Sequence, residues 1–158
     1  MENLESKTTV LNDLIRLNND RIAGYEKAIQ ALNENTTDLK TVFHDQIVQS
    51  YAFIAELKEA VEDTGGKAEV DETTTEGKLF RSWMDIKAIF TGSDRQSVLE
   101  SCIEGENAIH DAYTEASKLQ ELPTNTQFLI QQQKEKLAMS GKKIAALYHC
   151  RKIKVTNK

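Results

Sequence analysis

The chain has 158 residues, a length that suits one domain with a substantial core and is short for two. Its formal charge of -5 at pH 7 argues against generic nucleic-acid binding, and no apolar run approaches the roughly 18 residues that span a bilayer. The polar N-terminus MENLESK lacks the pattern of a signal peptide, and two cysteines do not make a disulfide framework. We therefore expect a cytoplasmic protein, with Cys102 in the core and Cys150 as a free thiol whose redox role the sequence leaves open.

Two amphipathic helices are predicted in the first part of the chain, at about residues 9–32 and 38–62, because apolar residues recur there every three or four positions. The turn at residues 33–36 is short enough to make these helices antiparallel neighbours. Gly65-Gly66 ends the second helix, because glycine readily takes the left-handed C-cap conformation. The inner stripes are Leu11, Leu14, Asn18, Tyr25, Ile29 and Leu32 in the first helix, and Leu39, Phe43, Ile47, Ser50, Ile54, Leu57 and Val61 in the second.

The polar stretch at residues 67–73 separates this helical pair from the rest of the chain. Thr73 and Glu76 have the Thr-x-x-Glu spacing of a capping box, which predicts a short helix. That helix places its apolar residues on one face and ends at Gly92. The residues on that face are Leu79, Trp83, Ile86 and Phe90.

A third long helix is predicted at about residues 94–119, opened by the capping-box spacing of Ser93 and Gln96. Most of its inner stripe is apolar, with one carboxylate in the middle. The stripe is Leu99, Cys102, Glu106, Ile109, Tyr113 and Ala116.

A fourth long helix is predicted at about residues 125–149, opened by a capping box from Thr124 to Gln127. Residues 151–158 carry several basic side chains and no acidic ones, so we expect them to form a solvated, disordered tail. The inner stripe of the fourth helix is Leu129, Gln133, Leu137, Ser140, Ile144 and Leu147.

These elements predict an all-α protein in which two antiparallel helix pairs form a four-helix bundle. The link between the pairs is long, so the bundle has one crossover, which contains the extra short helix. Residues 1–150 would form this single domain, followed by the tail. No segment shows the alternating pattern of a strand.

The most informative residue is Glu106, because an ionised side chain in a bundle core is costly unless it is paired, hydrogen-bonded or metal-bound. A rise of about 1.5 Å per residue places Asn18, Ser50, His110 and Gln133 at similar depths, with Glu106 about one turn away. Each of the four long helices thus contributes polar side chains near the middle of the bundle. This pattern predicts either a metal site or a buried polar network.

A di-iron centre would need several carboxylates and histidines, supplied in part by Glu-x-x-His pairs. The chain contains no Glu-x-x-His, and Glu106 and His110 are four residues apart. A single weakly held metal on these two residues remains an alternative. The interpretation we favour is a hydrogen-bonded network with no metal and no cofactor. In it Gln133, Asn18 or a core tyrosine, Tyr25 or Tyr113, donates to Glu106, and His110 is an additional donor.

The sequence resembles a family of uncharacterised bacterial four-helix bundles in the ferritin-like superfamily. The similarity includes the segment LNDLIRLNNDRIAGYE at residues 11–26 and the segment GKLFRSWMDIKAIFTGSD at residues 77–94, and it extends from the first long helix to the fourth. The residues that carry it are Asp20, Gly24-Tyr25, Arg81, Trp83, Lys87, Gly92 and Gly105-Glu106. This resemblance implies a ferritin-like fold and no established activity.

Many members of that family have a histidine on the last helix where this chain has Ser140-Gly141, a departure that further weakens a metal site. We therefore expect a non-enzymatic ferritin-like bundle with a structural or protein-interaction role, in which a role under stress is one option. The alternative is a metal-binding oxidase or iron-handling protein that uses Glu106 and His110. The expected partners are a second copy in a homodimer or an unidentified protein, without nucleic acid or membrane.

Overall fold

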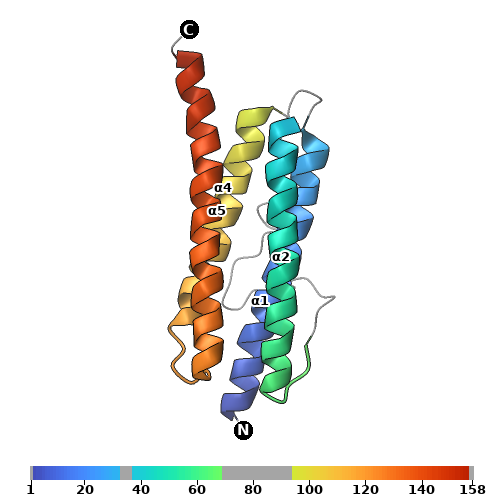
Figure 1. The fold of residues 1–158 in the computed structure, drawn as a ribbon, viewed down its shortest axis with the longest axis vertical. Coiled ribbons are helices and arrows are strands. Elements are labelled where there is room, and N and C mark those ends of the chain that lie inside the picture. The colour runs from blue at the N-terminus through green and yellow to red at the C-terminus, as the bar shows by residue number, and fades with distance from the viewer. Residues whose placement is uncertain (1, 33–36, 69–93, 157–158) are drawn as a thin grey trace.

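A computed structural model describes residues 2–32, 37–68 and 94–156. Four long helices account for nearly all of these residues, and Figure 1 shows them side by side along one axis. Their bounds are Glu2–Ala31 for α1, Thr37–Asp63 for α2, Arg95–Ser117 for α4 and Thr124–Thr156 for α5. The predicted all-α four-helix bundle is confirmed. The predicted crossover helix, with Trp83, lies outside the described residues.

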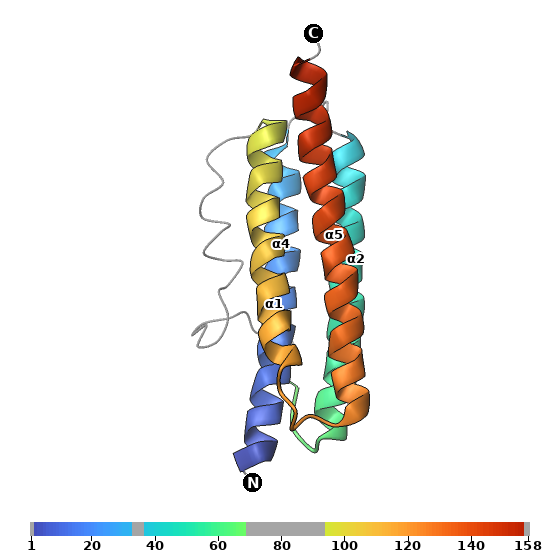
Figure 2. The same ribbon diagram turned by 90° about the vertical axis from the view of Figure 1, so that its left-hand side faces the viewer.

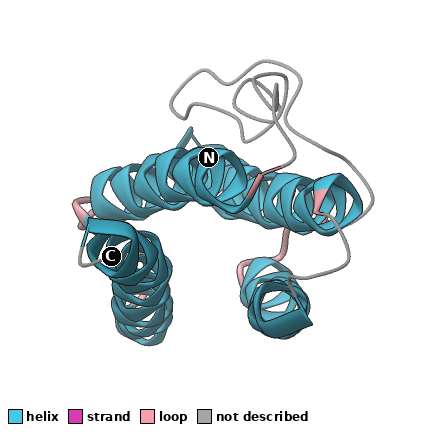
Figure 3. Ribbon diagram, turned by 90° about the horizontal axis from the view of Figure 1, so that it is seen from above, coloured by secondary structure: helices cyan, strands magenta, loops and turns pink. Residues whose placement is uncertain are grey.

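The bundle consists of two antiparallel hairpins, α1 with α2 and α4 with α5. Figures 2 and 3 show the four helices at the corners of a quadrilateral, in which α1 also packs on α4, and α2 faces α5. Arg95, in the first turn of α4, donates to both carboxylate oxygens of Asp38 in the first turn of α2, at 3.1 and 2.9 Å. The start of α4 therefore lies at the same end of the bundle as the start of α2.

The end of α2 follows the glycine signal in the sequence. Gly65 has a φ of 85°, which only glycine adopts without strain. The N–H of Gly66 donates to the carbonyl of Val61 at 3.2 Å, and that of Gly65 donates to the carbonyl of Glu62 at 3.0 Å. These two hydrogen bonds form a Schellman motif, which satisfies carbonyls that the helix end would otherwise leave free.

The helix bounds differ from the sequence-based expectations at three ends. The first helix begins at Glu2 rather than near Thr9, because its first turns have no apolar period for the sequence to display. The carboxylate of Asp94 caps α4 by accepting from the N–H of Ser97 at 3.2 Å, in place of the expected Ser93, which lies outside the described residues. Helix α5 continues to Thr156, through most of the segment that we expected to be a disordered tail.

The core contains the apolar stripes of all four helices, together with buried polar residues at the middle of the bundle. Arg21 has the largest fully buried side chain in the part of the chain that the structure describes. Among the described residues, no helix has an apolar stretch long enough to cross a membrane.

Candidate functional site

A buried ion pair joins α1 to α4 at the middle of the bundle. The Nε of Arg21 donates to Oε1 of Glu106 at 2.9 Å, and the side chains are 0% and 1% exposed. Arg21 reaches this position because it is on the inner stripe of α1, three residues after Asn18 and four before Tyr25. Its guanidinium carbon lies 5.5 Å from the centre of the Tyr25 ring, so the cation also rests against an aromatic face.

The remaining nitrogens of Arg21 bind α2. One terminal nitrogen, Nη1, donates to the hydroxyl of Ser50 at 2.9 Å and to the backbone carbonyl of Gln46 at 3.4 Å. The other, Nη2, donates to the side-chain oxygen of Gln46 at 2.9 Å. All three guanidinium nitrogens therefore have partners, which is the condition under which a buried arginine is tolerated.

Glu106 receives its hydrogen bonds on one oxygen only. The hydroxyl of Tyr25 donates to Oε1 at 2.5 Å, and this is the same oxygen that accepts from Arg21. The second oxygen, Oε2, is buried without a hydrogen-bond partner among the described residues. Helix α5 passes close to Glu106 at Gly141. A Cβ added at Gly141 would lie 3.8 Å from the Cβ of Glu106.

A chain of hydrogen bonds extends from this pair to the fourth helix. Ser50 donates to Oδ1 of Asn18 at 2.9 Å, and Nδ2 of Asn18 donates to the hydroxyl of Tyr113 at 2.9 Å. The Tyr113 hydroxyl donates to Oε1 of Gln133 at 2.6 Å. Gln133 in turn donates to Glu56 at 3.0 Å, near the surface of α2. Each helix contributes at least one member, so the network fixes all four helices in one register.

Burial and charge set the protonation states in this core. Burial is the largest single effect and lowers the pKa of Arg21, but the Glu106 carboxylate together with Tyr25 and Tyr113 outweighs it and raises that pKa above its usual value. Burial, followed by the repulsion of Glu106, raises the pKa of Tyr25 well above its usual range and does the same for the Cys102 thiol. Burial also raises the pKa of Tyr113. At neutral pH the arginine is therefore cationic, and the tyrosines and the thiol are neutral.

Of the five residues that we singled out in the sequence, the structure places four in or beside this network: Asn18, Ser50, Glu106 and Gln133. Glu106 accepts from Arg21 and from the core tyrosine Tyr25 rather than from Gln133 or Asn18. Those two side chains are instead joined to each other through the Tyr113 hydroxyl. His110 is half-buried, and its ring makes no hydrogen bond to the network among the described residues.

Two central members were missed in the sequence, Arg21 and Gln46. The spacing signal was present, because Arg21 continues the stripe of Leu14 and Asn18, and Gln46 lies between Phe43 and Ser50 on α2. We did not predict them as core residues because arginine and glutamine are mostly found at the surface.

The donor set of the core does not fit a di-iron centre. Such a centre needs several carboxylates and histidines around the metals, and the described residues contain no group of three or more metal-binding side chains. Two carboxylates are buried among the described residues, Asp20 and Glu106, and Glu106 is already neutralised by Arg21. A metal ion beside Oε1 of Glu106 would meet a fixed positive charge 2.9 Å from that oxygen.

The helix order and the long crossover define a ferritin-like four-helix bundle, and solved structures agree. A mutant of Dps1 from Mycobacterium smegmatis has a TM-score of 0.76 at 12% identity, covering 93% of this chain and 97% of that chain. A protein described as ferritin-like and diiron-carboxylate, from Bacillus anthracis str. Ames, has a TM-score of 0.68 at 13% identity, covering 94% of this chain and 99% of that chain. At these identities the likeness shows the fold alone.

The family follows from the sequence itself. Residues 6–119 match the model of a family described as a domain of unknown function, DUF2383, so the chain belongs to that family. A search of curated proteins finds no match to the chain. This match confirms the resemblance to a family of uncharacterised four-helix bundles that the sequence indicated.

Proposed function

We propose that this protein is a non-enzymatic ferritin-like bundle that works without a metal, as a structural or protein-interaction module of the cytoplasm. The observation that carries the proposal is the Arg21–Glu106 pair. In a diiron-carboxylate bundle, the metal ions supply the positive charge that balances buried carboxylates. Here a guanidinium supplies that charge from within the chain.

The pair also supports a structural role for the core. Two buried charges gain little net stability relative to well-packed apolar residues, whereas removing only one of them is strongly destabilising. Such a pair can specify how helices align, because any other register would leave a charge buried alone. A bundle held in one fixed register presents the same surface at all times, which suits an interaction module.

One observation favours a second candidate, a metal-binding oxidase or iron-handling protein that uses Glu106 and His110. Oε2 of Glu106 is buried without a hydrogen-bond partner among the described residues, so it retains capacity to accept a ligand. His110 follows Glu106 by one helical turn. The bundle would have to bring the half-buried His110 ring to the same point, away from the positive charge of Arg21.

Metal binding and ferrous-iron oxidation decide between the two candidates. The protein would be loaded with Fe(II) or Mn(II), desalted, and measured by elemental analysis before and after a chelator wash. We expect far less than one equivalent per chain and no oxidation of Fe(II) above the rate in buffer. One equivalent or more that is lost in Glu106→Gln would overturn the proposal, provided that the variant is folded by circular dichroism. Glu104→Gln, an exposed change on the same helix, is the matched control.

A further inference from the structure

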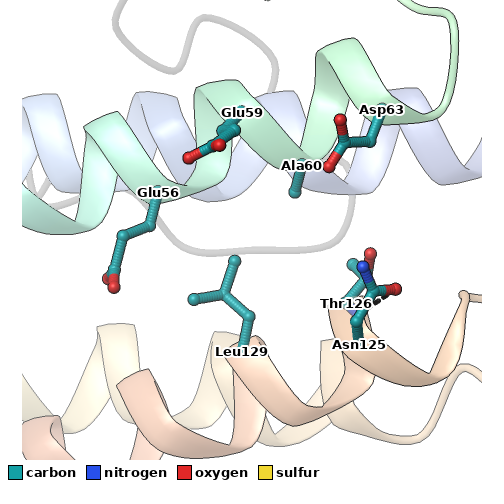
Figure 4. Close-up of a pocket in the computed structure, with 7 residues that line it drawn as sticks. All are labelled: Glu56, Glu59, Ala60, Asp63, Asn125, Thr126 and Leu129. Atoms are coloured by element: carbon teal, nitrogen blue, oxygen red, sulfur yellow. Dashed lines mark hydrogen bonds between the residues drawn. The ribbon is translucent and has the colours of Figure 1, made fainter.

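The outer face of α5 carries large apolar side chains that lie in solvent. Figure 4 shows Leu129 directed toward α2, so this side of α5 faces the bundle. The preceding residue, Phe128, is instead 63% exposed, and Met139 is 70% exposed. These two residues are eleven positions apart, which is about three helical turns, so they lie on one line along the helix. Figure 3 shows α5 at one corner of the bundle, with no described helix on its outer side.

This line extends along most of α5 at steps of three and four residues. Every member is exposed, and four of the seven are apolar. Because Leu137 and Ile144 are buried on the inner side, α5 has apolar residues on two opposite sides and is the least amphipathic of the four described helices. Single exposed apolar residues are normal, whereas a line of them along a helix indicates an interaction surface. The members are Phe128, Gln132, Glu135, Met139, Lys142, Ala146 and Cys150.

The charges on this line indicate what covers it. Glu135 lies about one turn before Met139, and Lys142 lies about one turn after it. Glu135 accepts one hydrogen bond, from Gln131 at 3.3 Å, and neither charged residue belongs to an ion pair of the described residues. A surface with its two opposite charges on either side of a central apolar residue can be complementary to a second copy of itself.

An antiparallel arrangement realises this complementarity. If a two-fold axis passes beside Met139, residues before Met139 in one copy lie opposite those after it in the other. Glu135 then comes level with Lys142 and Lys143 of the second copy, since it stands four residues before Met139 and the lysines stand three and four residues after it. The symmetry makes this charge contact twice. A parallel arrangement would place like charges side by side, which is unfavourable.

The same arrangement covers the exposed aromatic ring. Phe128 stands eleven residues before Met139, and Cys150 stands eleven residues after it. Phe128 of one copy therefore comes level with Cys150 of the other, one turn from Ala146. A ring against a sulfur atom and a methyl group is a favourable apolar contact.

We propose that the outer face of α5, residues 128–150, binds the same face of a second copy, antiparallel about a two-fold axis beside Met139. Such an interface uses one surface on both copies, so it closes as a dimer and does not continue into filaments. A contact of one helix on one helix is smaller than a standard interface of about 1,600 Å², so the dimer is weak and its population depends on concentration. This inference rests on the proposed interaction role and names the partner.

Sedimentation velocity over a wide range of protein concentration, at low salt, tests the proposal. We expect a monomer–dimer equilibrium for the wild type. Glu135→Lys places like charges opposite each other at both symmetric contacts and should weaken the dimer by about tenfold or more, and Lys142→Glu should do the same. Both positions are exposed, so each variant should fold normally, which circular dichroism checks.

The decisive sample mixes the two charge variants. In a mixed dimer each Lys introduced by Glu135→Lys meets an acidic residue of the Lys142→Glu copy, and the native Lys142 meets the native Glu135. The mixture should therefore regain dimerisation to within about threefold of the wild-type affinity, although each variant alone is monomeric. The double variant Glu135→Lys/Lys142→Glu should dimerise by itself for the same reason.

A matched pair of apolar substitutions tests the position of the interface. Met139→Glu brings two carboxylates together at the two-fold axis and should weaken the dimer by about tenfold or more. Val48→Glu makes a similar change at a residue of α2 that is 67% exposed, and it should leave the affinity within about twofold of the wild-type value.

Three results would overturn the proposal: a wild type that is monomeric at every concentration, charge variants that do not recover dimerisation when mixed, or a dimer that Val48→Glu weakens and Met139→Glu does not. The outcome is independent of the metal measurement. A metal-free monomer would leave the proposed function intact and remove this partner, and a metal-loaded protein that dimerises through α5 would do the reverse.

Discussion

The hydroxyl of Tyr25 lies 2.5 Å from Oε1 of Glu106, the same oxygen that accepts from Arg21. A neutral donor and a cationic donor thus share one lone-pair region of a buried carboxylate, and the other oxygen has no partner among the described residues. If either Arg21 or Tyr25 is replaced, the carboxylate keeps only the hydrogen bond from the other of these two side chains. We therefore expect single substitutions of these two donors to destabilise the protein, and loss of the cationic donor to cost more than loss of the neutral one.

Loss of Arg21 alone should be the most damaging change. Arg21→Met leaves Glu106 without its charge partner, and we expect a loss of about 3–5 kcal/mol in the free energy of unfolding. The double variant Arg21→Met/Glu106→Leu removes both charges and should recover most of that loss. Urea unfolding of the two single variants and the double variant measures the coupling. Equal losses in the single and double variants would contradict a paired role.

A surface ion pair provides the control for that cycle. Nζ of Lys118, the C-cap residue of α4, lies 3.0 Å from Oε1 of Glu115, and the side chains are 65% and 59% exposed. Lys118→Met should change the free energy of unfolding by at most about 1 kcal/mol.

Tyr25→Phe should have a smaller effect than Arg21→Met. It removes one hydrogen bond to a charged acceptor and keeps the ring, so we expect a cost of about 1.5–3 kcal/mol in urea unfolding. Tyr51→Phe is the control, because Tyr51 is 58% exposed and lies outside the core. A Tyr25→Phe variant as stable as Tyr51→Phe would show that the Tyr25 hydroxyl contributes nothing to the core.

Stability should fall at alkaline pH. Burial raises the pKa of Tyr25, Tyr113 and Cys102 in the folded protein above the ordinary values of 10.0 for tyrosine and 9.0 for cysteine. Above those ordinary values the unfolded chain loses protons that the folded chain retains, so the unfolded state gains stability with rising pH. The contribution is therefore complete below about pH 9 and is lost progressively above it.

Thermal unfolding between pH 7 and pH 11 measures this loss. The slope of Tm against pH above pH 10 should be shallower in Tyr25→Phe than in the wild type, because one of the three groups no longer titrates. An unchanged slope in Tyr25→Phe would show that this hydroxyl does not contribute to the alkaline loss of stability.

The two glycines that end α2 should respond differently to alanine. Gly65→Ala places a side chain at a φ of 85° in open space, so its cost of about 1–2 kcal/mol is backbone strain alone. Gly66→Ala puts a Cβ 2.5 Å from the hydroxyl of Thr8 on α1, an overlap that should cost about 1–3 kcal/mol. Adding Thr8→Ala should relieve the loss in Gly66→Ala and leave that in Gly65→Ala unchanged. Urea unfolding of the four variants checks this difference.

The sequence predicts the fold well because the bundle depends on local signals. Apolar spacing locates all four helices, and Gly65-Gly66 locates the end of α2. The ends that the sequence misses lack such signals: the first turns of α1 are polar, and nothing after Gly141 stops α5. The expected tail at residues 151–158 therefore begins as helix.

The core is harder to predict, because its chemistry depends on pairs that are distant in the sequence. Glu106 can be recognised in the sequence as a carboxylate on an apolar stripe, but its partner Arg21 is 85 residues away on another helix. The spacing of Arg21 continues the inner stripe of α1, but arginine is mostly found at the surface, so spacing alone does not identify it as a core residue. His110 has the right depth along the bundle and the wrong angle around its helix, so a depth count alone includes it.

The guanidinium at the centre of the bundle has a consequence for how the protein matures. A bundle whose core charge is balanced by metal ions completes its fold only when those ions have been acquired, so its stability follows the metal supply. An arginine is synthesised with the chain and stays charged at every physiological pH. The positive charge that balances Glu106 is therefore present as soon as the chain is synthesised, and this ion pair does not depend on the metal supply.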